Sequence, residues 1–161
     1  MPEIEDRLIT YLKDAHSLEL TSLKMLEKAT KTVEDGHLKA LFTDHLEETS
    51  RHHELISERL GAHGASPSMP KDVAQKATAV AKGMAAKAPK DAIARLARDA
   101  FVQEAAEIAA YELLSRVAEL AGDHETTEAA RRILARSATW PRSSPVHGVT
   151  WQSWPPARGA D

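Results

Sequence analysis

Apolar residues recur every three or four positions along four stretches of the chain, which is the spacing of amphipathic α-helices. The stretches cover residues 4–33, 37–60, 90–120 and 124 to about 134. The breaks between them carry residues that typically end or begin helices, namely Asp35-Gly36, Gly61, Pro89 and Gly122-Asp123. No alternation typical of strands occurs, so the pattern predicts an all-α protein.

The short first break predicts an antiparallel pair of long helices. Residues 61–89 are rich in Gly, Pro, Ser, Ala and Lys, and we interpret them as a crossover outside the main bundle, with a short helix within 71–87. The fourth helical pattern stops early. The expected domain organisation is therefore a helical bundle over residues 1–135, with a truncated fourth helix, followed by an irregular tail over 136–161.

Ionisable side chains occupy positions where the helical rhythm calls for apolar ones. They interrupt the apolar seams of the first three helices near mid-length, with apolar seam positions on both sides. Six of them are expected to face the interior at a shared level: Glu19, His45, Glu48, His52, Glu104 and Glu107. By contrast, His37, His53, His63 and His124 fall off the seams or at helix ends and are expected in solvent.

An unpaired ion in a protein interior costs several kcal/mol. A divalent or trivalent cation would turn repulsion among these carboxylates into coordination. Mixed Glu and His ligation suits iron, manganese or zinc, and inward-facing Glu and His are how helical bundles hold metal pairs. The predicted ligands are Glu19, Glu48, His52, Glu104 and Glu107. His45 is expected either to contact one of these ligands or to replace one as an alternative ligand.

Composition narrows the functional classes. The 161 residues contain no cysteine, which excludes disulfides and thiolate metal sites, and the net charge of −3 gives no basic excess for binding nucleic acid. The N-terminus has no signal-peptide pattern, and no stretch approaches the ~20 apolar residues of a membrane span. We expect a cytoplasmic protein with one domain and neither nucleic-acid nor membrane partners.

Three motifs then carry a family resemblance. The stretches 45–49 (HLEET) and 107–114 (EIAAYELL), together with 14–19 (DAHSLE) in the first helix, resemble the YciF/YciE-like family of bacterial ferritin-like proteins. The likeness covers roughly residues 4–135. It implies a ferritin-like four-helix bundle, often dimeric, associated with stress responses and carrying a metal site. Carried over by position, it points to Glu19, Glu48, His52, Glu104 and Glu107.

Two departures bear on that site. The usual Glu-x-x-His spacing is replaced by Glu48-x-x-x-His52, with Arg51 at the expected histidine position, and Ala105 stands where many relatives have histidine. Both changes remove part of the expected ligand geometry.

The tail departs further. Relatives continue the fourth helix with Leu-x-Glu-Glu, whereas here Leu134 is followed by a segment with all three tryptophans of the chain. One hypothesis is a reading-frame change near Ala135, because a one-base shift of one choice of codons for residues 137–141 reads Glu-Arg-Asp-Met-Ala and restores a glutamate at position 137. The alternative is a native tail whose Trp and Pro side chains dock in a groove.

The sequence therefore predicts a ferritin-like metal-binding protein, with iron as the favoured metal, a stress-associated role and a homodimeric state. Loss of fourth-helix carboxylates would weaken the site. Ferroxidase or peroxidase-like activity would need a redox metal with open coordination positions, and nothing in the sequence names a substrate. The alternative is a non-catalytic assembly protein whose buried polar residues set helix register.

Overall fold

A computed structural model describes residues 2–67 and 92–137, and every regular element in these residues is a helix. The helices are α1 (Pro2–Thr32), α2 (Gly36–Ala62), α4 (Ala92–Leu120) and α5 (His124–Ser137). The predicted all-α fold is confirmed. The helix expected within 71–87 and the tail from residue 138 onward lie outside the described residues, whereas Arg136 and Ser137, assigned to the tail by the sequence, belong to α5.

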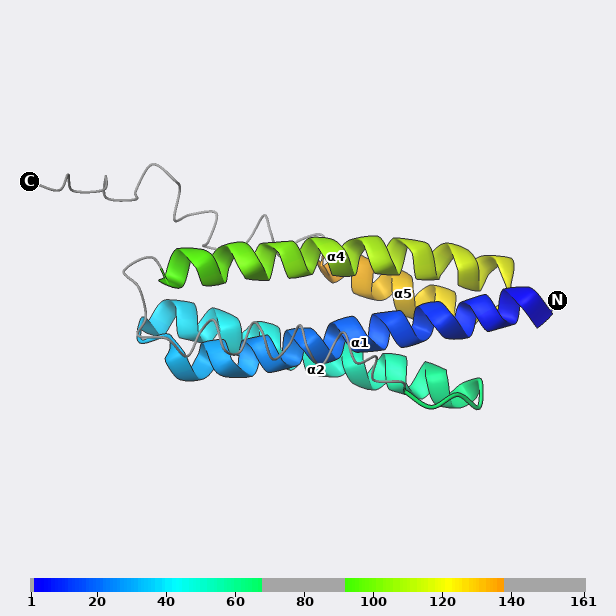
Figure 1. Ribbon diagram of the computed structural model, residues 1–161, viewed down its shortest axis with the longest axis horizontal. Helices are drawn as coiled ribbons and strands as arrows, with labels where there is room; N and C mark the ends of the chain where they lie inside the picture. The colour runs from blue at the N-terminus through cyan, green and yellow to red at the C-terminus, as the bar shows by residue number, and fades with distance from the viewer. Residues whose placement is uncertain (1, 68–91, 138–161) are drawn as a thin grey trace, which may run out of the picture.

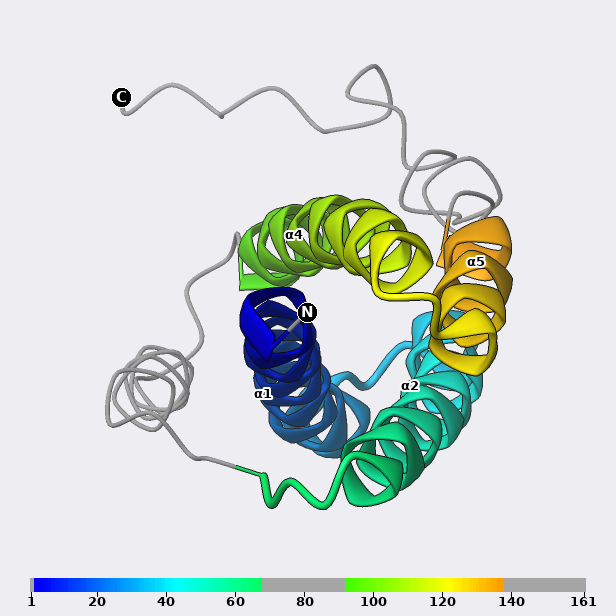
Figure 2. The ribbon, with the colours of Figure 1, turned by 90° about the vertical axis from the view of Figure 1, so that its right-hand side faces the viewer.

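The four helices form a ring around a common interior (Figures 1 and 2). Around the ring, α1 packs against α2 and α4, and α4 packs against α5, while α2 and α5 meet over a shorter stretch. At 14 residues, α5 is about half as long as α2, with 27. The described part of α5 lines one half of the bundle, and the predicted truncation of the fourth helix concerns residues outside the described ones.

Local capping explains where the helices begin and end. The Asp35 carboxylate accepts a hydrogen bond from the Leu38 backbone N–H at 2.9 Å, so Asp35 caps the start of α2. The expectation that Gly61 closes α2 is wrong. The helix continues to Ala62, and Gly64, at φ +64°, provides the left-handed residue that ends it, with the Ala65 N–H bonded to the Leu60 carbonyl. Gly122, at φ +73°, ends α4 in the same way.

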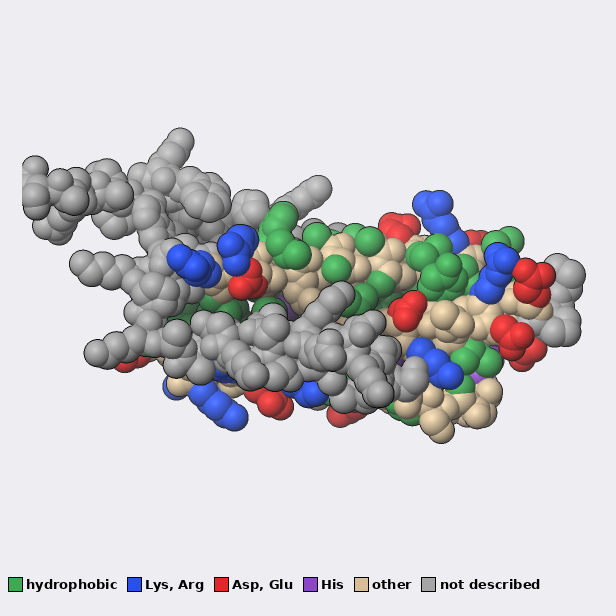
Figure 3. Space-filling model, in the orientation of Figure 1, with side chains coloured by type: hydrophobic (Ala, Val, Ile, Leu, Met, Phe, Trp, Pro, Cys, Tyr) green, Lys and Arg blue, Asp and Glu red, His purple; other side chains and the backbone are tan. Residues whose placement is uncertain are grey.

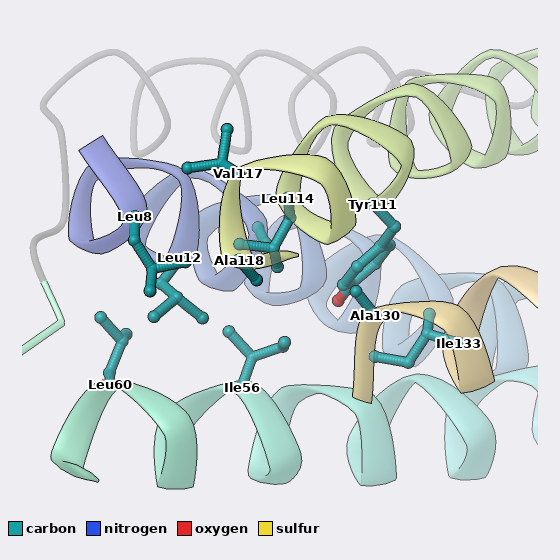
Figure 4. Close-up of a cluster of buried hydrophobic side chains, with 11 residues drawn as sticks. Leu8, Leu12, Ile56, Leu60, Tyr111, Leu114, Val117, Ala118, Ala130 and Ile133 are labelled. Carbon is teal, nitrogen blue, oxygen red and sulfur yellow. The ribbon is translucent and has the colours of Figure 1, made fainter. Parts of the chain in front are cut away.

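The interior contains two apolar clusters, one at each end of the bundle. The first combines all four helices, and Figure 4 shows Leu8 and Leu12 of α1 pointing toward Ile56 and Leu60 of α2. Its buried members are Leu8, Leu12, Ala15, Ile56, Leu60, Tyr111, Leu114, Val117, Ala118, Ala130 and Ile133. Among the described residues, the second comes from α1, α2, α4 and Val33, which follows α1: Met25, Leu26, Ala29, Val33, Phe42, Leu96 and Ala100. On all three long helices, the polar residues singled out in the sequence lie between these two clusters.

A junction of charged side chains fixes α5 to the end of α2. Arg59 lies 3.3 Å from Asp123 and also contacts Glu125, while the His63 ring lies 2.7 Å from Asp123. Burial alone would raise the pKa of Asp123, but hydrogen bonds from Thr126 and His63 and the Arg59 charge lower it to about 2. The expectation that His63 is solvated is therefore wrong, since its ring is mostly buried against Asp123. Asp123 also caps α5 through the Thr126 backbone N–H.

Candidate metal centre

Five of the six polar residues expected in the interior are buried there. Glu19 of α1 is fully buried, and Glu104 and Glu107 of α4 are each 2% exposed. His45 and His52 of α2 are 9% and 8% exposed. The seam spacing therefore predicted correctly that three carboxylates and two imidazoles from three helices are buried.

The first group of contacts in this layer centres on Glu19. The Tyr111 hydroxyl donates a hydrogen bond to Glu19 Oε1 at 2.5 Å, and His52 Nδ1 lies 3.6 Å from the same oxygen. Burial, then the charge of Glu19 and its hydrogen bond, raise the pKa of Tyr111 well above its usual value. Tyr111 therefore remains a neutral hydroxyl that holds Glu19 from the neighbouring helix α4.

The second group centres on Glu104 and Glu107. His45 Nε2 lies 3.3 Å from Glu104 Oε2. Glu107 Oε1 accepts hydrogen bonds from the Ser22 hydroxyl and from Gln103 Nε2, the latter at 3.3 Å. Burial, then the nearby charges of Glu19 and Glu104, raise the pKa of Glu107 to about 8. The hydrogen bond from Ser22 opposes this rise. The three carboxylates are thus close enough to repel one another.

Cationic side chains do not balance these carboxylates. Among the buried described residues there is no lysine or arginine. Glu19 Oε2 and Glu104 Oε1 are buried and have no hydrogen-bond partner among the described residues. An unsatisfied buried carboxylate oxygen is costly, so one such atom on α1 and another on α4 fit the ligand set of a cation better than that of a completed hydrogen-bond network.

The donors are gathered in one layer, but they are not yet arranged as a coordination sphere. Within residues 2–67 and 92–137, no three histidine, aspartate or glutamate side chains converge on one point in ligating geometry. The present contacts instead pair a carboxylate with a neighbour: Glu19 with Tyr111, Glu104 with His45, and Glu107 with Ser22. Binding a cation would therefore require side-chain rotation in which these pairs exchange partners.

Glu48 is the one predicted ligand that the structure places elsewhere. Its side chain is 25% exposed, and its Oε1 lies 3.3 Å from Nε of Arg136 near the end of α5. The buried positions of α2 in this region are His45, Thr49 and His52, at spacings of four and three. Thr49 thus takes the inward position that the sequence analysis assigned to Glu48.

Sequence reasoning missed the partners of the carboxylates. Ser22, Gln103 and Tyr111 were not predicted as site residues, yet all three hydrogen-bond to Glu19 or Glu107. A signal was available, because a hydroxyl on a core line at the height of a buried carboxylate is a natural donor to it. What the sequence lacked was the relative height of α1 and α4.

A pair of imidazoles lies beside the layer. The rings of His16 and His53 are 4.3 Å apart between centroids, and His16 is buried one turn before Glu19. Burial and then the nearby His53 lower the pKa of His16. His53 was expected in solvent, but it is half-buried, and its Nε2 has no hydrogen-bond partner among the described residues.

Within the part of the chain that the structure describes, no helix combines the length and the apolar character needed to cross a membrane.

Several solved structures are similar to this chain in fold. A crystal structure of a protein from Xanthomonas campestris pv. campestris matches with a TM-score of 0.74 and 19% identity, over 91% of this chain and 92% of that one. A bacterioferritin from Desulfovibrio desulfuricans, described with a diiron site in different catalytic states, matches with a TM-score of 0.70 and 19% identity, over 99% of this chain and 94% of that one.

A third match is a two-domain protein from Anabaena variabilis that contains DJ-1/ThiJ/PfpI-like and ferritin-like domains. It has a TM-score of 0.67 and 22% identity, over 98% of this chain and 42% of that chain. No curated protein matches the sequence. At these identities the likeness concerns the fold, and the fold is that of a ferritin-like helical bundle.

A family model described as a domain of unknown function (DUF892) matches residues 3–139. This range includes α1, α2, α4 and α5 and every residue of the buried polar layer. The protein therefore belongs to the DUF892 family, with a ferritin-like fold.

Proposed function

We propose that this protein binds a metal ion in its central layer, through Glu19, His52, Glu104 and Glu107, with His45 as an alternative ligand or as the partner that orients Glu104. The observation that carries the proposal is the pair of buried carboxylate oxygens, Glu19 Oε2 and Glu104 Oε1, which lack hydrogen-bond partners among the described residues. A cation would satisfy both oxygens and cancel the mutual repulsion of the carboxylates.

Iron is the favoured metal, with manganese and zinc as alternatives, because carboxylate and imidazole ligands suit all three and no thiolate is present. The likeness to a bacterioferritin with a diiron site supports this choice. A bound iron ion would supply redox and Lewis-acid chemistry, and the chain's own contribution is a buried layer of carboxylates held by Tyr111, Ser22 and Gln103. A stress-associated role in the bacterial cytoplasm, as in YciF/YciE-like proteins, completes the proposal.

Metal binding can be tested on the full-length chain after removal of bound metal with a chelator. We expect Fe²⁺ (without oxygen) or Mn²⁺ to bind, and the double variant Glu19→Gln/Glu104→Gln to lose about 100-fold or more in affinity, since each removed ligand commonly costs tenfold or more. The matched control is Glu27→Gln/Glu112→Gln, which removes two exposed carboxylates from the same two helices. Calorimetric titration with elemental analysis gives the readout. Equal binding by the parent and the Glu19/Glu104 variant would refute the proposal.

The alternative is that the layer sets the register of the helices without binding metal. The cross-helix contacts Tyr111–Glu19 and Ser22–Glu107 favour it, because each fixes α1 against α4. In that case no metal would bind to the parent protein, while the double variant would show multiple conformations in its NMR spectrum. The same pair of measurements therefore separates the two functions.

Self-association is the other part of the proposal. Large hydrophobic side chains of α4 are exposed, and Figure 3 shows hydrophobic side chains gathered along this helix: Phe101, Val102, Leu113 and Leu120. Burying this face between two copies would remove apolar surface from water. We expect a dimer by light scattering coupled to size exclusion, and a shift toward monomer in Val102→Glu/Leu113→Glu. A monomeric parent protein would contradict this part.

A further inference from the structure

We infer that the central layer holds a single cation per chain instead of the pair typical of carboxylate bundles, and that the Arg136 guanidinium stands where a second cation would be needed. This inference rests on the proposed metal binding and concerns how many ions bind. Three observations support it: the types of residue that α5 buries, the ion pair of Glu48 with Arg136, and the buried carboxylate oxygens that lack a hydrogen-bond partner among the described residues.

The contribution of α5 is the first observation. Helical bundles that bind two metal ions take a Glu from each of two helices and a Glu-His pair from each of the other two, so all four helices supply ligands. The buried residues of α5 are Thr126, Thr127, Ala129, Ala130, Ile133 and Ser137. None is a carboxylate or an imidazole. The acidic residues of α5, Glu125 and Glu128, are exposed.

The partner of Glu48 is the second observation. Glu48 lies on α2 between His45 and His52, and its carboxylate would be a natural ligand for a second ion. Instead its Oε1 lies 3.3 Å from Nε of Arg136. A guanidinium is permanently charged, so it neutralises this carboxylate without any metal. It also places positive charge beside the layer, which disfavours a second cation there.

The charge of the buried carboxylates, and their oxygens that are unpaired among the described residues, also favour one bound ion over two. Two divalent ions would bring four positive charges to three buried carboxylates, whereas one ion brings two. Glu19 Oε2 and Glu104 Oε1 are buried without a hydrogen-bond partner among the described residues, while Glu107 Oε1 already accepts from Ser22 and Gln103. These two oxygens come from the neighbouring helices α1 and α4, and one cation would satisfy both.

The stoichiometry can be measured directly. The metal-free full-length protein is titrated with Mn²⁺, and with Fe²⁺ without oxygen, and the bound ions per chain are counted by native mass spectrometry and elemental analysis. We expect one ion per chain. Two ions per chain in the parent protein would overturn the inference, whereas no binding at all would instead refute the proposed function on which it rests.

Two variants separate the roles of Glu48 and Arg136. Glu48→Gln is expected to leave the stoichiometry at one and change the affinity less than threefold, while Glu104→Gln lowers the affinity at least tenfold. Arg136→Glu places a carboxylate beside Glu48 and is expected to add a second, weaker ion. Because Arg136 is 58% exposed near a helix end, this variant should keep the fold, which circular dichroism checks. A tenfold loss in Glu48→Gln, or one ion in Arg136→Glu, would overturn the role given to Arg136.

Discussion

The protein contains two clusters of charged residues that shift the pKa of a carboxyl group in opposite directions. At the junction of α2 and α5, Asp123 is surrounded by Arg59, His63 and Thr126, and its pKa falls to about 2. In the central layer, Glu107 lies near two further carboxylates, and its pKa rises to about 8. Burial raises the pKa of both carboxyl groups. At Asp123, hydrogen bonds from Thr126 and His63 and the Arg59 charge outweigh burial, whereas at Glu107 the charges of Glu19 and Glu104 add to it.

This contrast separates a cluster whose charges are balanced from the layer in which we propose that a metal ion binds. At the junction, Arg59 supplies the positive charge and Thr126 and His63 supply hydrogen bonds to Asp123, which also caps α5. These side chains balance one another and fix α5 to α2. The central layer has its hydrogen-bond donors in Tyr111, Ser22 and Gln103 but no buried lysine or arginine among the described residues. A layer of this kind lowers stability unless something positive enters it.

The pH dependence of stability tests the contrast most strongly. Folded Glu107 keeps its proton up to about pH 8, whereas in the unfolded chain it releases the proton near 4.5. The folded state therefore holds an extra proton between these values, so the metal-free protein should lose stability as pH rises from 4.5 to 8, by at most roughly 5 kcal/mol. Urea unfolding at several pH values measures this loss. The slope should flatten in Glu107→Gln, and identical slopes in the two proteins would contradict the assignment.

Breaking the junction should have the next largest effect. Arg59→Ala leaves Asp123 without its guanidinium partner, and we expect the free energy of unfolding to fall by roughly 3 kcal/mol at neutral pH. The control is Arg7→Ala, which removes an exposed pair with Glu3 and should cost less than ~0.5 kcal/mol. A loss at Arg59 no larger than at Arg7 would show that the junction does not stabilise the fold.

Removing a charge from the central layer should act in the opposite direction. In the metal-free protein at pH 8, Glu19→Gln relieves the repulsion on Glu107 while its amide oxygen still accepts from Tyr111. We expect stability to rise by about 1 kcal/mol, with the pKa of Glu107 falling by about one unit. Urea unfolding and NMR titration of the Glu107 side chain measure the two quantities. Destabilisation without metal would mean that the carboxylates do not repel one another.

Ser22→Ala gives the smallest expected effect. The Ser22 hydroxyl donates to Glu107 and lowers the pKa of that carboxyl against the rise from burial. Its loss should raise the pKa of Glu107 further, by less than ~1 unit. NMR titration of Glu107 is the readout, with Ser57→Ala as a control, because the Ser57 hydroxyl bonds only a carbonyl of its own helix among the described residues. An unchanged Glu107 pKa would show that this hydrogen bond does not form in solution.

The sequence was enough to predict the four helices and most of the buried layer. Seam positions such as Glu19 and Glu107 repeat every three or four residues, and this spacing alone decides which face of a helix turns inward. The register of α2 was harder, because Glu48 and Thr49 both fit the spacing between His45 and His52. Which of the two is buried depends on the position of α5, whose Arg136 contacts Glu48.

Helix ends and hydrogen-bond donors from distant helices were harder to predict from the sequence. The sequence predicts that Gly61 ends the helix, and only the backbone geometry shows that Gly64 takes the left-handed conformation. The hydrogen bond from Tyr111 to Glu19 joins residues far apart in sequence. Its existence depends on how far α1 and α4 slide along each other, a quantity that local patterns do not determine.

The unequal number of described helices around the two apolar clusters has a dynamic consequence. Within the described residues, the cluster around Leu26 and Phe42 is formed by α1, α2 and α4 together with Val33, whereas the cluster around Leu12 and Ile56 also includes α5. Amide hydrogens near Leu26 and Phe42 should exchange faster with water, because local opening there breaks fewer of these contacts. The carboxylate layer lies between the two clusters, so local opening around Leu26 and Phe42 would expose this layer to water while the α5 end stays folded.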